Sequence, residues 1–189
     1  MKIKYDRYIN NRVLIGMVRP QWENECAINS IAGALNSISN RQLRRGDIYK
    51  LTGWDKAAVI NGKMDNDDIV GALEKGLHLM GLSGTAKFHR RVFADEETSW
   101  RLFKKSVRKG GNVLIYHAEG HYCLIAGYLE EPLENNHADM KGYRKRRDWI
   151  VIADHDYDVE PIRMLQWADA RRECTTDREF GVITLSVRG

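Results

Sequence analysis

Apolar residues recur every three or four positions in three segments, which is the spacing of one face of an α-helix. The segments are residues 26–38, 66–80 and about 95–109. The first helix is expected to begin at or just before its cysteine. The second follows Asp65 and Asn66, residue types that cap helix starts well. The pattern thus predicts three amphipathic helices in the first 110 residues.

The second half of the chain has the pattern of strands. Four runs are rich in Val, Ile and Tyr and are bounded by turn residues, namely residues 112–117, 121–128, 149–154 and 180–187. Residues 13–18 are interpreted as a further strand or extended segment. A short helix is predicted near 160–170, because Glu160-Pro161 suits a first helical turn. Helices followed by antiparallel strands indicate the α+β class, with N-terminal helices packed on an antiparallel sheet.

Size and composition indicate one domain spanning residues 1–189,. A chain of this length buries roughly 70% of its extended surface, so its core needs neither disulfides nor a structural metal. No run approaches the roughly 20 apolar residues of a membrane helix, and residues 1–12 lack the features of a signal peptide. We expect no membrane span and a cytoplasmic location, with secretion by a signal-peptide-independent route as the alternative.

Charge and cysteine content narrow the function classes. The net charge is +4, but no dense basic stripe is interleaved with aromatics, so nucleic acid is not an expected partner,. The three cysteines are widely spaced and form no CxxC pair, which indicates free thiols rather than disulfides or a zinc site,. The charged stretch 130–148 is interpreted as a solvated loop between two strands. The sequence does not indicate an oligomeric state.

Three polar residues stand at the ends of predicted elements. Cys26 begins the first helix, where the helix dipole and free N–H groups favour thiolate, the nucleophilic form,. His121 opens a strand directly after Gly120, where it can serve as a base. Asp154 ends the apolar run WIVIAD and can hold the imidazole in its working tautomer,. This arrangement predicts nucleophilic catalysis through a Cys-His-Asp triad.

A glutamine precedes the cysteine by five positions. Its side-chain amide and the backbone N–H of Cys26 would together form an oxyanion hole for a tetrahedral intermediate of acyl transfer. Gln21 is therefore the fourth candidate catalytic residue.

The order Gln, Cys, His, Asp resembles that of papain-like cysteine peptidases, and most closely the branch of double-glycine leader peptidases (peptidase C39-like). In that branch a glutamine is followed after a short spacer by an acidic residue, the cysteine and a small residue, as in residues 21–27 (QWENECA). A histidine then opens a strand that ends near Gly-Tyr, as in residues 121–128 (HYCLIAGY). The resemblance spans about residues 13–187 and implies a papain-like fold, the triad Cys26, His121 and Asp154, and Gln21 in the oxyanion hole.

Two positions depart from the family pattern. Ala27 stands where the family usually has glycine, a small change. His155 stands where the family usually has proline after the aspartate, which leaves Asp156 as an alternative to Asp154. The family pattern offers no counterpart for the basic stretch 130–148.

Metal sites are not expected. The string HAEGH is not the HExxH motif,. The aspartates from Asp154 to Asp158 imitate the opening of a calcium loop, but Val159 and Leu165 stand where its glycine and glutamate are required,. The sequence therefore predicts a catalytic site without a metal or other cofactor.

The resulting hypothesis is a cysteine peptidase that hydrolyses a peptide or isopeptide bond in a peptide or protein substrate. A triad of this kind forms an acyl-enzyme, and the acceptor decides the reaction. A deamidase, a transglutaminase-like enzyme or an acyltransferase, acting as a secreted effector or toxin, therefore stays open. So does a non-catalytic peptide-binding domain on the same fold.

Overall fold

The computed structural model describes residues 6–18, 24–62, 64–90, 96–118, 120–131, 147–154, 160–176 and 181–188. The helices and strands of this part of the chain are, in order, β1 (Asp6–Ile9), α1 (Asn11–Gly16), α2 (Cys26–Ile38), α3 (Arg45–Thr52), α4 (Lys56–Ile60), α5 (Asn66–Leu79), β2 (Gly84–His89), α6 (Glu96–Arg108), β3 (Asn112–Ala118), β4 (His121–Glu131), β5 (Arg147–Ala153), β6 (Ile162–Gln166), α7 (Trp167–Thr176) and β7 (Gly181–Val187).

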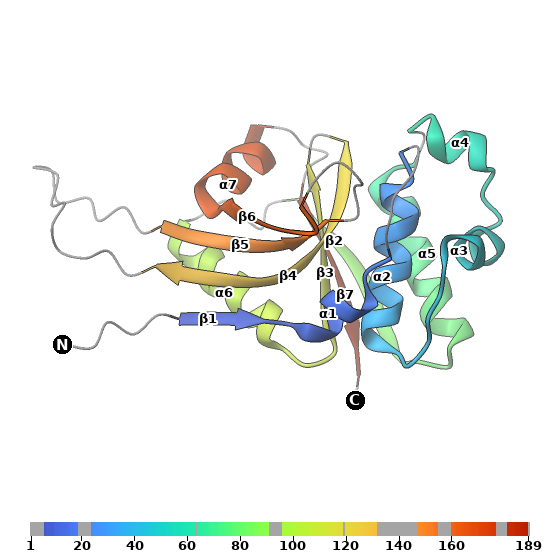
Figure 1. The fold of residues 1–189 in the computed structure, drawn as a ribbon, viewed down its shortest axis with the longest axis horizontal. Helices are drawn as coiled ribbons and strands as arrows, with labels where there is room; N and C mark the ends of the chain where they lie inside the picture. Colours follow the sequence, from blue (N-terminus) through green and yellow to red (C-terminus); the bar gives the residue numbers. More distant parts are fainter. Residues whose placement is uncertain are drawn as a thin grey trace, which may run out of the picture.

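The strands form one antiparallel sheet in the order β2-β7-β3-β4-β5-β6 (Figure 1). The long strand β4 has β5 on one side and two partners on the other. Residues 121–125 of β4 pair with β3, and residues 127–130 pair with β1. Strands β1 and β3 therefore lie one after the other along the same side of β4. His121, the first residue of β4, lies at the end that pairs with β3.

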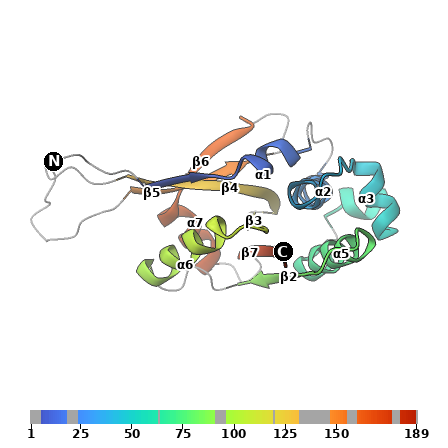
Figure 2. The ribbon, with the colours of Figure 1, turned by 90° about the horizontal axis from the view of Figure 1, so that it is seen from below.

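Helices cover both faces of the sheet. Successive residues of β4 alternate between two buried clusters, because side chains of a strand point to opposite faces,. One cluster contains the apolar residues of α2 and α5, and the other those of α6 and α7. Figure 2 shows α2, α3 and α5 gathered at one side, with α6 and α7 apart from them. Helix α2 is buried on nearly all sides, since α1, α3, α5 and the sheet all pack against it.

The α+β class with helices on an antiparallel sheet is confirmed, and so are the predicted long elements. The helix over 26–38 has the predicted bounds, and the other two helices and four strands lie within a few residues of theirs. None of the described helices is both long enough and apolar enough to cross a bilayer. The expectation of one domain spanning 1–189 stays a prediction.

The interpretation of residues 13–18 as a strand or extended segment was wrong for residues 13–16. They belong to α1, whose start is capped by the side chain of Asn10, which accepts a hydrogen bond from the backbone N–H of Arg12. The helix ends at Gly16, where a Cβ would lie 2.7 Å from Ser37 Oγ and 2.9 Å from the carbonyl of Gly33. Glycine thus lets α1 pack directly against α2.

The helix predicted near 160–170 was also wrong over its first half. Residues 162–166 form β6, which pairs with β5, and α7 begins only at Trp167. Pro161 precedes the strand, and its carbonyl accepts a hydrogen bond from the N–H of Asp154 at 3.0 Å. Residues 162–166 extend the sheet as its edge strand, so their pairing with β5 decides their conformation,. The sequence analysis had made no prediction for β1, β2, α3 and α4.

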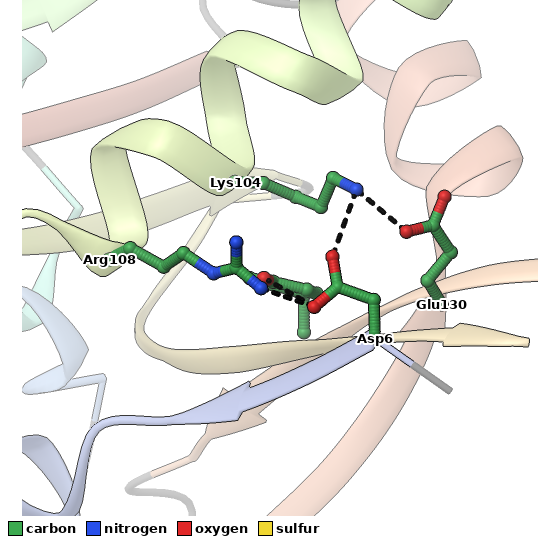
Figure 3. Close-up of polar contacts among 5 residues, drawn as sticks. Asp6, Lys104, Arg108 and Glu130 are labelled. Atoms are coloured by element: carbon green, nitrogen blue, oxygen red, sulfur yellow. Dashed lines mark hydrogen bonds and ion pairs between the residues drawn. The ribbon is translucent and has the colours of Figure 1, made fainter. Parts of the chain in front are cut away.

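A cluster of charged side chains fixes β1 to α6 (Figure 3). The carboxylate of Asp6 pairs with Lys104 at 3.2 Å and with Arg108, and the same lysine pairs with Glu130 of β4 at 2.6 Å. The hydroxyl of Tyr128 donates to Asp6. Three elements far apart in the sequence are thereby joined at the end of β4 opposite its first residue.

Candidate active site

The start of α2 is held in place by buried charge. Asn24 adopts a left-handed conformation (φ 55°), which asparagine tolerates better than most residues and which turns the chain into the helix,. Glu25 is only 3% exposed. Its carboxylate accepts hydrogen bonds from Arg45 (2.7 Å) and Tyr49 (2.8 Å) of α3. Because Glu25 is anchored, the next residue, Cys26, is fixed as the first residue of α2.

The hairpin between β3 and β4 brings a histidine to this cysteine. Ala118 pairs with His121, so two residues connect the strands. The second, Gly120, has φ 72°, a conformation that glycine adopts without strain,. The Sγ atom of Cys26 lies 3.9 Å from the carbonyl oxygen of Gly120. The turn therefore packs against the thiol and sets His121 beside it.

An aspartate completes the arrangement. Asp154 directly follows β5 and is only 1% exposed. Its Oδ1 lies 2.8 Å from Nε2 of His121. With Nε2 engaged by the carboxylate, Nδ1 is the ring nitrogen left to face Cys26. The structure thus brings together the three residues that the sequence analysis proposed as a triad, although they come from α2, β4 and the end of β5.

These neighbours change the ionisation of the histidine. Burial lowers the pKa of His121, but hydrogen bonds with Asp154 and Cys26, together with their negative charges, outweigh this and raise it to about 10. The imidazole is accordingly protonated at neutral pH. A protonated imidazole thus lies beside the thiol of Cys26.

Arg163 was not anticipated from the sequence. Its Nε lies 2.9 Å from Oδ2 of Asp154, so the two carboxylate oxygens have different partners. The residue lies on β6, in the stretch interpreted as a helix. An interpretation of residues 162–166 as a strand would have paired them with the run ending at Asp154, which was the available signal.

A cleft of about 700 Å³ opens beside Cys26. One wall is the pair of rings of His117 and Tyr122, stacked at 4.0 Å between centroids. The tyrosine hydroxyl lies 3.2 Å from Oδ1 of Asn66 at the start of α5. The cleft also bears charge, from Asp65, Asp67 and Arg90, together with apolar residues of α4. The lining of the cleft is therefore mixed, with charged, aromatic and apolar side chains.

One set of side chains resembles a metal site. The ligand atoms of His121, Cys123 and Asp154 lie within 4.8 Å of one another. However, burial and the nearby charge of Asp154 raise the pKa of the Cys123 thiol, whereas metals bind the thiolate,. Both oxygens of Asp154 are also engaged, by His121 and Arg163. The set is therefore better suited to orienting the histidine than to holding a metal.

Other candidates lie outside the described residues. These are Gln21, the proposed oxyanion donor, and Asp156, the alternative to Asp154. Most of the stretch 130–148 also lies outside, while its two ends belong to β4 and β5.

Comparisons with known proteins give distant similarities. No protein-family model matches the chain. A basic immunoglobulin-like variable motif-containing protein of Giardia intestinalis is 22% identical over 208 aligned positions, which cover 90% of this chain and 77% of that protein. Among solved structures, the peptidase domain of Streptococcus ComA, a bi-functional ABC transporter involved in a quorum sensing pathway, is 12% identical. The match covers 92% of this chain and 99% of that one, with a TM-score of 0.47. These values assign no family.

Proposed function

We propose that this chain is a papain-like cysteine peptidase that hydrolyses a peptide or isopeptide bond, with Cys26 as nucleophile, His121 as general acid and base, and Asp154 as the group that orients the imidazole. The observation that carries the proposal is the continuous set of contacts from the thiol through the histidine to a buried carboxylate. The motifs that resemble the C39-like branch of peptidases support it independently.

The proposed reaction begins with the thiolate of Cys26, which attacks the carbonyl carbon of the scissile bond. Protonated His121 gives its Nδ1 proton to the leaving nitrogen as the C–N bond breaks, which leaves a thioester on the enzyme. Water then attacks the thioester while His121 accepts one of its protons. The C–S bond breaks, the carboxylic acid leaves, and the thiolate and imidazolium are restored.

The tetrahedral intermediates of both steps carry a negative charge on oxygen. The backbone N–H of Cys26 is a suitable donor for it, because the side chain before α2 provides no cap for the first turn of the helix,. In the proposed mechanism the side-chain amide of Gln21 is the second donor, on the strength of the motif.

Alanine variants of the two reacting residues test this proposal. Cys26→Ala and His121→Ala should each reduce cleavage of a varied peptide mixture, followed by mass spectrometry, by about 10³-fold or more. His78→Ala is the matched control, since His78 lies exposed on α5 and should be dispensable. Retained cleavage in folded Cys26→Ala or His121→Ala would sink the proposal.

A peptide-based electrophile separates the alternatives. A non-catalytic peptide-binding domain predicts that Cys26 is labelled no faster than Cys123 or Cys174, whereas the proposed peptidase predicts much faster labelling of Cys26. Products in the same mass spectra identify the acceptor. Cleaved peptides indicate hydrolysis, a mass gain of about 1 Da at glutamine indicates deamidation, and amine adducts indicate acyl transfer.

A further inference from the structure

We propose that Arg163 is a positioning residue for this site, holding the carboxylate of Asp154 so that one oxygen stays directed at His121. The inference rests on the proposed function, because it assigns a role in keeping the catalytic histidine oriented. Arg163 itself is not among the residues lining the cleft beside Cys26.

The pairing of β5 with β6 fixes the backbone of Arg163 close to that of Asp154. Arg163 pairs with Ile152 in the register of β5 and β6, and Asp154 follows two residues later on the same face,. The bond from the N–H of Asp154 to the carbonyl of Pro161 continues the pairing past the end of β5. The position of the arginine therefore depends on the backbone of two paired segments and not on side-chain packing alone.

The division of the two carboxylate oxygens removes a rotational freedom. Oδ1 accepts a hydrogen bond from His121 Nε2 at 2.8 Å, and Oδ2 accepts one from Arg163 Nε at 2.9 Å. A carboxylate with one partner can turn about its χ2 angle, and the hydrogen bond to the histidine turns with it. With the second oxygen bound, any such turn breaks a second charge-assisted hydrogen bond.

Because Asp154 is buried, the loss of its hydrogen bond with Arg163 would not be compensated by water. Asp154 is 1% exposed, so little water is available to replace a lost hydrogen bond,. The Arg163 side chain is 44% exposed and keeps much of its own hydration. Among the described residues, the titratable groups near the carboxylate are His121, Arg163 and Cys123, with Cys26 beyond the histidine. Arg163 and the protonated histidine are the cations among them.

The first test is the rate of Cys26 alkylation by iodoacetamide at pH 7, quantified by mass spectrometry for the Cys26 peptide alone. In the wild type this rate should exceed that of an ordinary free thiol, because the protonated histidine lies beside the Cys26 thiol. Arg163→Gln should lower the rate by about 10-fold, because His121 loses its fixed orientation. It should also lower kcat on a cleaved peptide by about 10-fold to 100-fold, with KM changed less than about twofold. Arg163→Lys, which keeps the charge but not the planar guanidinium, should fall between the two.

Controls separate this inference from the proposed function. Arg41→Gln makes the same change at an exposed position and should match the wild type. If wild-type Cys26 reacts like an ordinary free thiol, the proposed function fails. If Cys26 of the wild type reacts faster than an ordinary free thiol and Cys26 of Arg163→Gln reacts at the same rate, the positioning role is overturned while the proposed function stands. Should Arg163→Gln not fold by circular dichroism, Arg163→Lys decides, and wild-type rates in that variant overturn the proposal.

Discussion

The charge state of one imidazole links the geometry of the site to its reactivity. A histidine in water has a pKa of about 6.5 and is mostly neutral at physiological pH. Here the hydrogen bonds and negative charges of Asp154 and Cys26 raise the pKa of His121 to about 10, despite the opposing effect of burial. In the proposed mechanism, the proton that the leaving group needs is therefore already on the imidazole before a substrate binds.

This charge state has a measurable consequence in alkaline solution. The activity of the proposed peptidase should persist to pH 9 and decline as His121 loses its proton near pH 10. Because its folded pKa exceeds the unfolded value of 6.5, its contribution to the free energy of unfolding is complete below pH 6.5 and is lost as the pH rises to about 10,. NMR titration of the imidazole would measure the pKa of His121. Urea unfolding of wild type and His121→Gln at pH 6 and pH 10 would measure its contribution to the free energy of unfolding. A titration midpoint near 6.5 would contradict the assignment.

Sequence reasoning found those site residues whose local surroundings carry a signal. Cys26, His121 and Asp154 each stand at the end of a strongly patterned segment, and the structure brings them together. Arg163 does not stand at the end of a predicted segment, and its contact with Asp154 depends on the pairing of β6 with β5. The hydrogen bonds between Glu25 and α3 were not predicted for the same reason, because these side chains meet only in the folded chain.

At the scale of elements, long and regular segments were predicted well and short ones poorly. Helix α2 has enough apolar positions to fix its period, whereas β1 and β2 have only four and six residues. A stretch as short as 13–18 has no decisive period, so tertiary contacts with α2 determine that its residues 13–16 are helical,. The hairpin of β3 and β4 was implicit in two predicted strands separated by a glycine.

That hairpin yields a prediction about Gly120. A Cβ at this position would meet no atom within 4 Å, so the cost of Gly120→Ala comes from its positive φ alone, about 1 kcal/mol,. Relaxation of the turn should shift His121 and lower kcat by about 10-fold or more. Gly53→Ala is the matched control, with φ 74°, open space and a position at the end of α3. It should cost similar stability, measured by urea unfolding, without loss of kcat. Equal activity in the two variants would argue against positioning by the turn.

The whole molecule places the site where its two buried clusters meet. Cys26 belongs to the cluster under α2 and α5, while Cys123, two residues after His121, belongs to the cluster under α6 and α7. The sheet between them carries the histidine and the aspartate at neighbouring strand ends. The sequence predicted the α+β layering but not the strand order, because antiparallel strands that are distant in sequence pair through contacts that no local pattern encodes.

The end of β4 opposite His121 is stabilised by ion pairs. Burial raises the pKa of Asp6, but Lys104 and Arg108 outweigh it and hold the pKa below its ordinary value of 3.8. The contribution of Asp6 to stability is therefore present above pH 3.8 and is lost as the pH falls through the lower folded value. This end of the sheet should respond to acid and salt independently of the site.

Asp6→Asn tests that independence. At pH 7 and low salt the variant should unfold with about 1 kcal/mol less free energy than the wild type, a modest figure because the Asp6 side chain is 34% exposed,. The difference should shrink at high salt and vanish in strong acid, where the wild type has lost the same pairs. Asp169→Asn, which breaks an exposed pair with Arg172 on α7, should cost less than about half as much,. Asp6 lies opposite Glu130 in the strand register of β1 and β4, at the far end of β4 from His121. The kcat/KM of Asp6→Asn should therefore equal that of the wild type. A fall in kcat/KM at full folding would instead mean that β1 transmits its position along β4 to the histidine.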